Sequence, residues 1–170
     1  LCAAAVAVLA WSGAERPVLL VSADGGLTGV LGAAGRALSK PKGAGFVAKS
    51  WLEDDGDLAT QEAAFARQGF RGAKGDLTAE VAGLTLRHLT GKGAAGRVAG
   101  ACTGGALVVT SADWDAPSPG GCLLFDSRKL TATGSLAIYP GPRIVTAREA
   151  AGDRLWNRRT APRRRLAARQ

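Results

Sequence analysis

The strongest strand signal in the chain is the run Ala106-Leu-Val-Val-Thr110. A short apolar run of this kind is typical of a strand that is covered on both faces. A second run, Cys122-Leu-Leu-Phe-Asp126, follows a loop rich in proline and glycine at 115–121. We therefore expect these two runs to be neighbouring inner strands of one sheet.

Weaker signals on both sides of this pair predict a mixed fold. The predicted strands are 18–21, 27–31, 36–39, a hairpin over 77–86, and a terminal hairpin over 135–139 and 143–148. The predicted helices are 46–52, 60–67 and 94–102, with Thr60 as the N-cap of the second helix and Gly69 as its C′ residue. The expected fold class is α/β or α+β, a single domain over 17–156 with one twisted mixed sheet and flanking short helices.

Length and composition agree with one globular domain. The chain has 170 residues, of which 46% are hydrophobic and 21% charged, and this balance excludes a disordered chain. Its 24 glycines follow no collagen period, and no repeat of solenoid length is present. The sequence does not begin with methionine, which predicts that it starts inside a longer protein or has been processed.

The net charge of +8 is concentrated at the C-terminal end. Residues 1–142 hold 13 Lys or Arg and 12 Asp or Glu, whereas residues 143–170 hold 9 and 2. Residues 157–170 are therefore predicted to form a basic, disordered tail. Its arginines are candidates for contact with nucleic acid or with a membrane surface: Arg158, Arg159, Arg163, Arg164, Arg165 and Arg169.

The first residues form an uncharged, mainly apolar run that ends near Ala14, before Glu15, Arg16 and Pro17. As a helix, 14 residues rise about 21 Å, which is short of the ~30 Å hydrocarbon core of a bilayer. Three interpretations remain open: the end of a transmembrane helix, the apolar region of a signal peptide, or a buried helix. We favour the first, with residues 1–16 as the end of a membrane helix and Trp11 at the interface.

Three features of the sequence are candidate sites of chemistry. Gly26, Gly29, Gly32 and Gly35 recur every three residues, but they punctuate short strands and open no helix, so turns are the expected role. The acidic cluster Glu53, Asp54, Asp55 and Asp57 follows a predicted helix and lacks calcium-loop spacing, so a solvated turn is expected. His88, the single histidine, has no neighbouring nucleophile or acid in sequence and is expected to be structural or on the surface. Neither a catalytic residue nor a metal or cofactor site is predicted.

Two of the three cysteines flank the strongest strands. Cys102 and Cys122 offer no four-ligand zinc spacing, so two roles remain open for them. In an oxidising compartment they are a candidate disulfide, and in a reducing one they are small buried hydrophobic residues.

Six segments, in order, resemble the C-terminal part of alphaproteobacterial ComEC-family competence proteins. They are Arg16-Pro-Val-Leu-Leu-Val-Ser-Ala-Asp-Gly25, Trp51-Leu-Glu-Asp-Asp-Gly-Asp57, Cys102 before Ala106-Leu-Val-Val109, Cys122-Leu-Leu-Phe-Asp126, Gly134-Ser-Leu-Ala-Ile-Tyr139 and Gly152-Asp-Arg-Leu-Trp156. Proteins of this family are large membrane channels that carry incoming single-stranded DNA across the inner membrane. In the family the channel is followed by a metallo-β-lactamase-like domain, whose active form needs an H-x-H-x-D-H cluster that this chain lacks.

The resemblance implies a reduced metallo-β-lactamase-like fold without hydrolase chemistry. It implies a non-catalytic accessory domain on the periplasmic side of the inner membrane, after the end of a transmembrane helix. The expected partners are the rest of the same channel, single-stranded DNA, and the lipid bilayer through residues 1–14. The alternative is a small secreted or periplasmic binding domain with a signal peptide and no role in DNA uptake.

Overall fold

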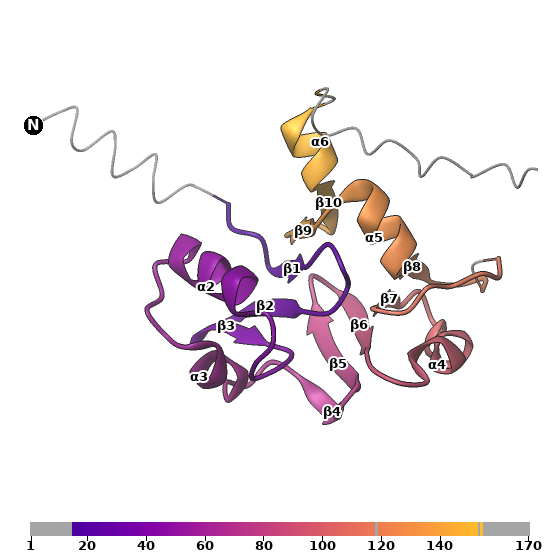
Figure 1. Cartoon of the computed structure of the whole chain (residues 1–170), viewed down its shortest axis with the longest axis horizontal. Helices are drawn as coiled ribbons and strands as arrows, with labels where there is room; N and C mark the ends of the chain where they lie inside the picture. Colours follow the sequence, from indigo (N-terminus) through magenta and orange to yellow (C-terminus); the bar gives the residue numbers. More distant parts are fainter. Residues whose placement is uncertain (1–14, 118, 153, 155–170) are drawn as a thin grey trace, which may run out of the picture.

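The computed structural model describes residues 15–117, 119–152 and 154, which fold into two five-stranded sheets with short helices (Figure 1). The first sheet is antiparallel throughout. Its strands lie in the order β10 (Arg143–Thr146), β9 (Leu136–Tyr139), β1 (Leu19–Val21), β2 (Thr28–Gly32) and β3 (Gly35–Leu38). In the centre of this sheet, Leu19 lies opposite Val30 on one side and Ile138 on the other.

The second sheet is mixed. Its strands lie in the order β4 (Arg71–Ala73), β5 (Asp76–Val81), β6 (Leu84–Leu89), β7 (Leu107–Thr110) and β8 (Leu123–Phe125). β4, β5 and β6 are antiparallel, whereas β6, β7 and β8 are parallel. The two strongest strand signals are thus neighbours, as predicted, but β8 is an edge strand and the expectation of two inner strands is wrong for it.

Four of the described helices lie between these strands in the sequence, and the fifth follows the last strand. They are α2 (Gly45–Asp54), α3 (Gln61–Phe65), α4 (Ala94–Ala101), α5 (Ser127–Thr133) and α6 (Ala147–Ala151). Thr60 is the N-cap of α3, as predicted, and its hydroxyl accepts a hydrogen bond from the Ala63 amide. Gly69 is not the C′ residue, because α3 is capped at Ala66; an added Cβ on Gly69 would lie 2.7 Å from the Ala37 Cβ.

The two sheets pack against each other around an inner core. Its buried residues are Leu19, Val21, Val30, Leu136 and Ile138 of the first sheet, Ala79, Val81, Leu86, Leu107, Val109 and Phe125 of the second, and Leu130 of α5. The expectation of one mixed sheet is therefore corrected to two sheets within a single small domain. Short strands with similar apolar patterns do not indicate to which sheet they belong, so the sequence alone does not predict two separate sheets.

The outer faces of the sheets are covered by helices. α4 packs on the second sheet through Ala94, Val98 and Ala101, which contact Val108 of β7. β7 is consequently covered on both faces, since Leu107 and Val109 belong to the inner core. Burial of each of these side chains contributes roughly 1.5–3 kcal/mol.

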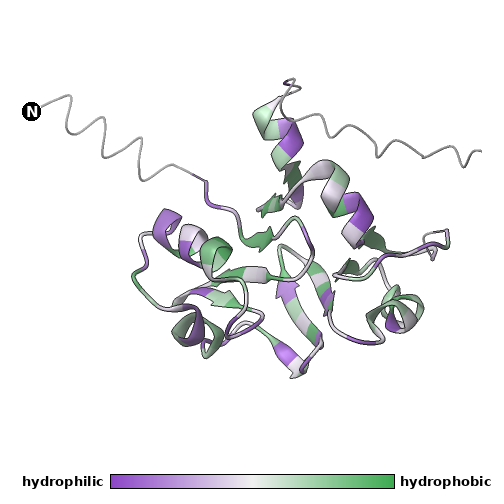
Figure 2. Cartoon of the chain, viewed as in Figure 1, coloured by the Kyte–Doolittle hydropathy of each residue, from purple (hydrophilic) through white to green (hydrophobic). Residues whose placement is uncertain are grey.

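α2 and α3 form a third cluster on the first sheet, with these buried members: Leu27, Leu38, Ala48, Leu52 and Ala64. The layers are thus helix, sheet, sheet and helix, and in Figure 2 hydrophobic residues predominate in β1 and β2, whereas β4 and β5 carry hydrophilic residues as well.

Residues 1–14 and 155–170 lie outside the described part of the chain, and with them the predicted membrane segment (apart from residues 15 and 16) and the basic tail. Among the described helices, none has the length and apolar character needed to cross a membrane.

Candidate functional site

His88 lies on β6 in the space between the two sheets and is 2% exposed. Its Nε2 is 2.9 Å from the Gly25 carbonyl oxygen, and its Nδ1 is 3.1 Å from the Thr28 hydroxyl. A carbonyl can only accept, so Nε2 carries the proton and Nδ1 accepts a hydrogen bond from Thr28. Both ring nitrogens are therefore used to join the second sheet to the β1–β2 turn of the first.

Burial lowers the pKa of His88 to about 4, although the hydrogen bond to the Gly25 carbonyl favours the protonated form. The imidazole is neutral near pH 7, and neither nitrogen is free to bind a metal or to accept a proton from a substrate. Within residues 15–117, 119–152 and 154, no group of three or more His, Cys, Asp and Glu side chains is placed to hold a metal ion.

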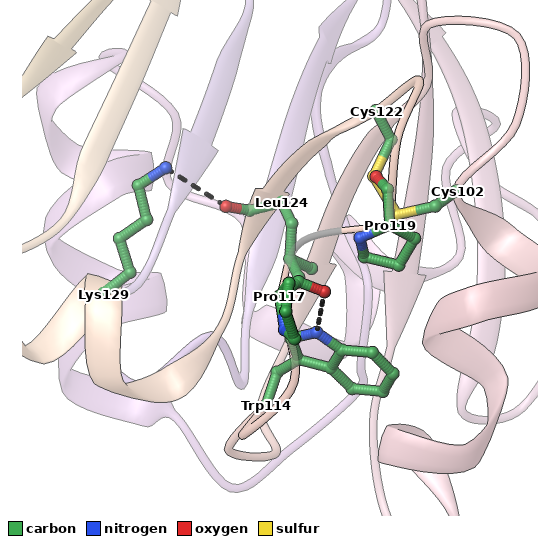
Figure 3. Close-up of a disulfide and its surroundings, with 7 residues drawn as sticks. All are labelled: Cys102, Trp114, Pro117, Pro119, Cys122, Leu124 and Lys129. Atoms are coloured by element: carbon green, nitrogen blue, oxygen red, sulfur yellow. Dashed lines mark hydrogen bonds between the residues drawn. A yellow bond between two sulfur atoms is a disulfide. The ribbon is translucent and has the colours of Figure 1, made fainter.

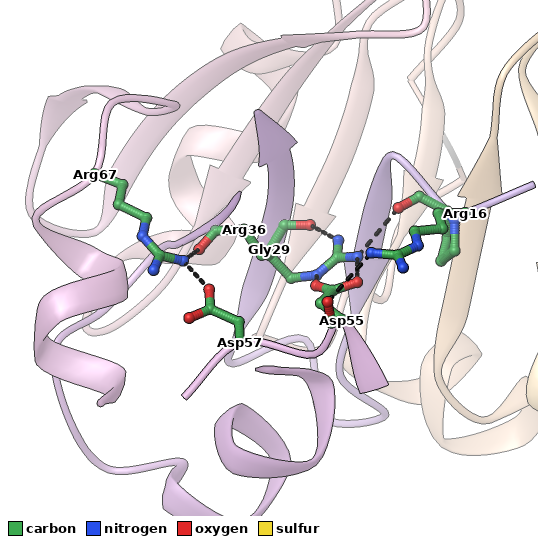
Figure 4. Close-up of polar contacts among 7 residues, drawn as sticks. Arg16, Gly29, Arg36, Asp55, Asp57 and Arg67 are labelled. Carbon is green, nitrogen blue, oxygen red and sulfur yellow. Dashed lines mark hydrogen bonds and ion pairs between the residues drawn. The ribbon is translucent and has the colours of Figure 1, made fainter. Parts of the chain in front are cut away.

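The acidic cluster after α2 is more ordered than a solvated turn. The Arg36 side chain on β3 is fully buried and meets Asp55 through two hydrogen bonds, Nε to Oδ2 at 2.6 Å and an Nη to Oδ1 at 3.0 Å (Figure 4). The same guanidinium donates to the carbonyl oxygens of Gly29 at 3.1 Å and Pro17 at 3.2 Å. The expectation of a solvated turn is therefore wrong for Asp55, which neutralises a buried cation.

Space for Arg36 comes from Gly29 on the neighbouring strand. A Cβ added to Gly29 would lie 2.7 Å from the Arg36 Cδ. Asp57 forms a second pair with Arg67, whose guanidinium also donates to the Arg36 carbonyl at 3.0 Å. The hydrogen bond from Arg67 lowers the pKa of Asp57. Both ion pairs hold the segment after α2 against β3. Each carboxylate is engaged by an arginine, so the arrangement gives no indication of catalysis.

The predicted turn glycines divide into two groups. Gly26 lies in the turn before β2, as expected, whereas Gly29 and Gly32 lie within β2 and Gly35 is the first residue of β3, so the turn role is wrong for these three. None of the four opens a helix, so the dismissal of a nucleotide-binding loop at 26–35 agrees with the structure.

A different glycine pattern, Gly91-x-Gly93-x-x-Gly96, follows β6 and opens α4, where a dinucleotide loop would lie. Sequence reasoning overlooked it, although the spacing is visible. In nucleotide-binding folds the ligand occupies the crevice beyond the carboxyl ends of such strands. Here the turn at Gly25 covers that end of the sheet: an added Cβ on Gly25 would lie 2.5 Å from the Thr110 carbonyl oxygen. The turn at Gly25 therefore lies against the end of β7, where such a ligand would bind.

The cysteines Cys102 and Cys122 form a disulfide in the structure (Figure 3). Cys102 caps the end of α4, and Cys122 directly precedes β8, with 4.9 Å between their Cα atoms. The bond closes a loop that includes β7 and the segment before β8. Trp114, within this loop, packs against the buried cluster of α4 and β7 and donates from its indole Nε1 to the Pro117 carbonyl at 3.2 Å.

The remaining predicted site residues, Arg158, Arg159, Arg163, Arg164, Arg165 and Arg169, all lie outside the described residues. No protein-family model, no curated protein and no solved structure matches this chain. The function proposed for this chain therefore rests on its own residues and on the six segments that resemble ComEC-family proteins.

Proposed function

We propose that this chain is a non-catalytic accessory domain of a ComEC-family channel for DNA uptake, on the periplasmic side of the bacterial inner membrane. The structural use of His88 is the observation that carries the non-catalytic part. A hydrolase of the resembled family needs several metal-binding histidines, and here the single histidine is buried with both nitrogens engaged.

The layer order and the disulfide support the other parts of the proposal. Helices outside two packed sheets are what a reduced metallo-β-lactamase-like domain would have, which favours the resemblance. A disulfide between Cys102 and Cys122 favours an oxidising compartment such as the periplasm, because cytosolic thiols are kept reduced. The alternative, a small secreted or periplasmic binding domain, would share the disulfide but would have no role in DNA uptake.

Transformation of the natural host tests this role. Removal of residues 17–156 from the chromosomal gene should reduce transformation and leave DNA capture at the cell surface unchanged. Normal transformation without these residues would overturn the proposal. Carbonate extraction of membranes distinguishes the proposed channel domain from the alternative, a secreted or periplasmic binding domain. A channel domain stays with the membrane, whereas a secreted domain is released.

Absence of catalysis needs its own assay. The full chain, supplied with zinc or manganese, should not hydrolyse single-stranded DNA or a phosphodiester reporter. Hydrolysis that is lost in a folded His88→Asn variant would contradict the proposal.

A further inference from the structure

Large hydrophobic side chains are exposed on α2 and on the segment that follows it. Phe46 on α2 is 87% exposed, and Leu58 beyond its end is 96% exposed. Such exposure of bulky apolar groups is unfavourable in water unless another phase or molecule covers them. The two side chains therefore make this part of the molecule a candidate contact surface.

These two residues flank one groove. The groove, of about 340 Å³, is lined by Gly45, Lys49, Leu52 and Glu53 of α2 and by residues 57–61. Phe46 and Lys49 are three residues apart and share a helix face, so Phe46 lies beside the α2 wall of the groove. Leu58 belongs to the opposite wall. We call this surface the α2 groove.

The chain enters the domain next to the α2 groove. Arg16 donates from a terminal guanidinium nitrogen to the Asp55 carbonyl oxygen at 3.2 Å, just after the end of α2. Figure 1 shows the entering segment passing α2 on its way to β1. The uncharged apolar run ends near Ala14, and the two residues from there to Arg16 can span at most about 7 Å. If this run is in a bilayer, the α2 groove is held close to the bilayer surface.

The charges around the groove suit contact with the interfacial region of a lipid bilayer. Lys49 pairs with Glu53 at 3.6 Å, and the carboxylates of Asp55 and Asp57 are paired with arginines. The charged side chains that line the groove are therefore paired, while the exposed carboxylates of Asp54 and Glu62 follow groove residues in the sequence, so insertion would be driven by the apolar side chains and would need no anionic lipid.

We infer that the α2 groove rests on the membrane, with Phe46 and Leu58 inserted among the lipid headgroups and the upper acyl chains. The inference rests on the proposed function, because it requires residues 1–14 to be anchored in the bilayer. It adds an orientation to that proposal: the edge of the domain formed by α2 faces the lipid.

Site-directed spin labelling of the full chain in vesicles tests this orientation. In a Cys2→Ser background, the only thiol outside the disulfide is then the one introduced by Phe46→Cys, Leu58→Cys, Ala10→Cys or Ala132→Cys. Ala10 lies in the apolar run and reports the anchor, and Ala132 is an exposed residue of α5 that serves as the control. Relaxation by oxygen, which concentrates in lipid, is compared with relaxation by a water-soluble nickel chelate in phosphatidylcholine vesicles, with and without phosphatidylglycerol.

We expect the ratio of oxygen to nickel relaxation at positions 46 and 58 to rise several-fold on addition of vesicles, in both lipid mixtures, and the ratio at position 132 to stay unchanged. With the label at position 46, a further Leu58→Ser change should reduce the inserted population by about tenfold, as expected for loss of one buried leucine side chain. Phe46, Leu58 and Ala132 are exposed, so the fold should persist in these variants.

The other outcomes overturn the inference in distinguishable ways. A label that inserts at position 10 while 46 and 58 behave like 132 leaves the anchor intact and refutes the orientation. A label at position 10 that stays in water refutes the membrane anchor and the orientation together. Labels at 46 and 58 that are immobilised before vesicles are added show that protein covers the groove, and this also refutes lipid contact.

Discussion

Replacement of Asp55 by asparagine should destabilise the domain far more than the same change at its neighbour Asp54. The Arg36 side chain is fully buried, and two of its four hydrogen bonds end on the Asp55 carboxylate. Asp55→Asn removes the negative charge and replaces one acceptor oxygen by an NH2 donor, so the guanidinium stays buried without a counter-ion. Removal of one partner of a buried ion pair costs about 3–5 kcal/mol, and the retained carbonyl contacts favour the lower end, about 3 kcal/mol.

Two matched controls separate burial from charge. Asp54→Asn changes the same side chain at an exposed position, and the expected loss is within about 0.5 kcal/mol. Glu53→Gln breaks the exposed pair with Lys49, for which about 0.2–1 kcal/mol is expected. The double variant Arg36→Met with Asp55→Asn removes the buried cation as well and should recover part of the stability lost in Asp55→Asn.

Urea unfolding measures these differences as shifts of the midpoint at a constant slope. A loss of about 3 kcal/mol is a large share of the ~5–15 kcal/mol that stabilises a typical domain. Equal midpoints for Asp55→Asn and Asp54→Asn would refute a structural role of the buried pair. A double variant less stable than Asp55→Asn would show that Arg36 stabilises the fold without Asp55.

Three further predictions concern pH, the disulfide and the tail. The pKa of His88 is about 4 in the folded chain and 6.5 for the free side chain, so below pH 6.5 the unfolded chain binds a proton that the folded chain does not. Stability should therefore be full above pH 6.5 and fall by about 3 kcal/mol as the pH drops to 4. Calorimetry should show a weaker pH dependence of stability in a folded His88→Gln variant. Reduction of the Cys102–Cys122 disulfide, whose sequence separation is 20, should cost about 3 kcal/mol, measured by unfolding with and without reductant; two free thiols in periplasm-derived protein would show that the bond does not form there. Deletion of residues 157–170 should abolish most binding to single-stranded DNA in filter assays, and the binding of the full chain should fall steeply with salt; strong, salt-resistant binding by the shortened chain would point to a specific groove instead.

Local patterns in the sequence predicted most of the strands and the helices α2, α3 and α4. The apolar run at 106–110 and the turn residues between strands are short-range signals, and they correspond to β7 and to the hairpins of both sheets. Two helices were missed although they carry N-terminal signals. The apolar run 122–126 predicts Asp126 as the end of a strand, whereas its carboxylate accepts a hydrogen bond from the Lys129 amide as the N-cap of α5. Thr146 and Glu149 form a capping box at the start of α6, within what was predicted as strand.

Features that depend on distant residues could not be predicted. The sequence around Arg36 does not indicate that its side chain is buried, because its partner Asp55 and the space left by Gly29 come from other elements. The division into two sheets depends on β1 pairing with β9, which lies more than a hundred residues further along the chain. The environment of His88 likewise depends on a turn that is about sixty residues away in sequence.

The strand order of the first sheet has a consequence for the timing of folding. β1 is central, but its neighbour β9 is synthesised near the end of the domain, with Leu20 opposite Ala137. β2 and β3 can form a meander with β1 at once, whereas the sheet is complete only after nearly the whole domain has emerged. Pairing across such a separation is slow, because the loop must close before the contact forms. If the domain is periplasmic, as proposed, the chain would therefore cross the membrane with the inner core still open, and the final structure would form on the far side.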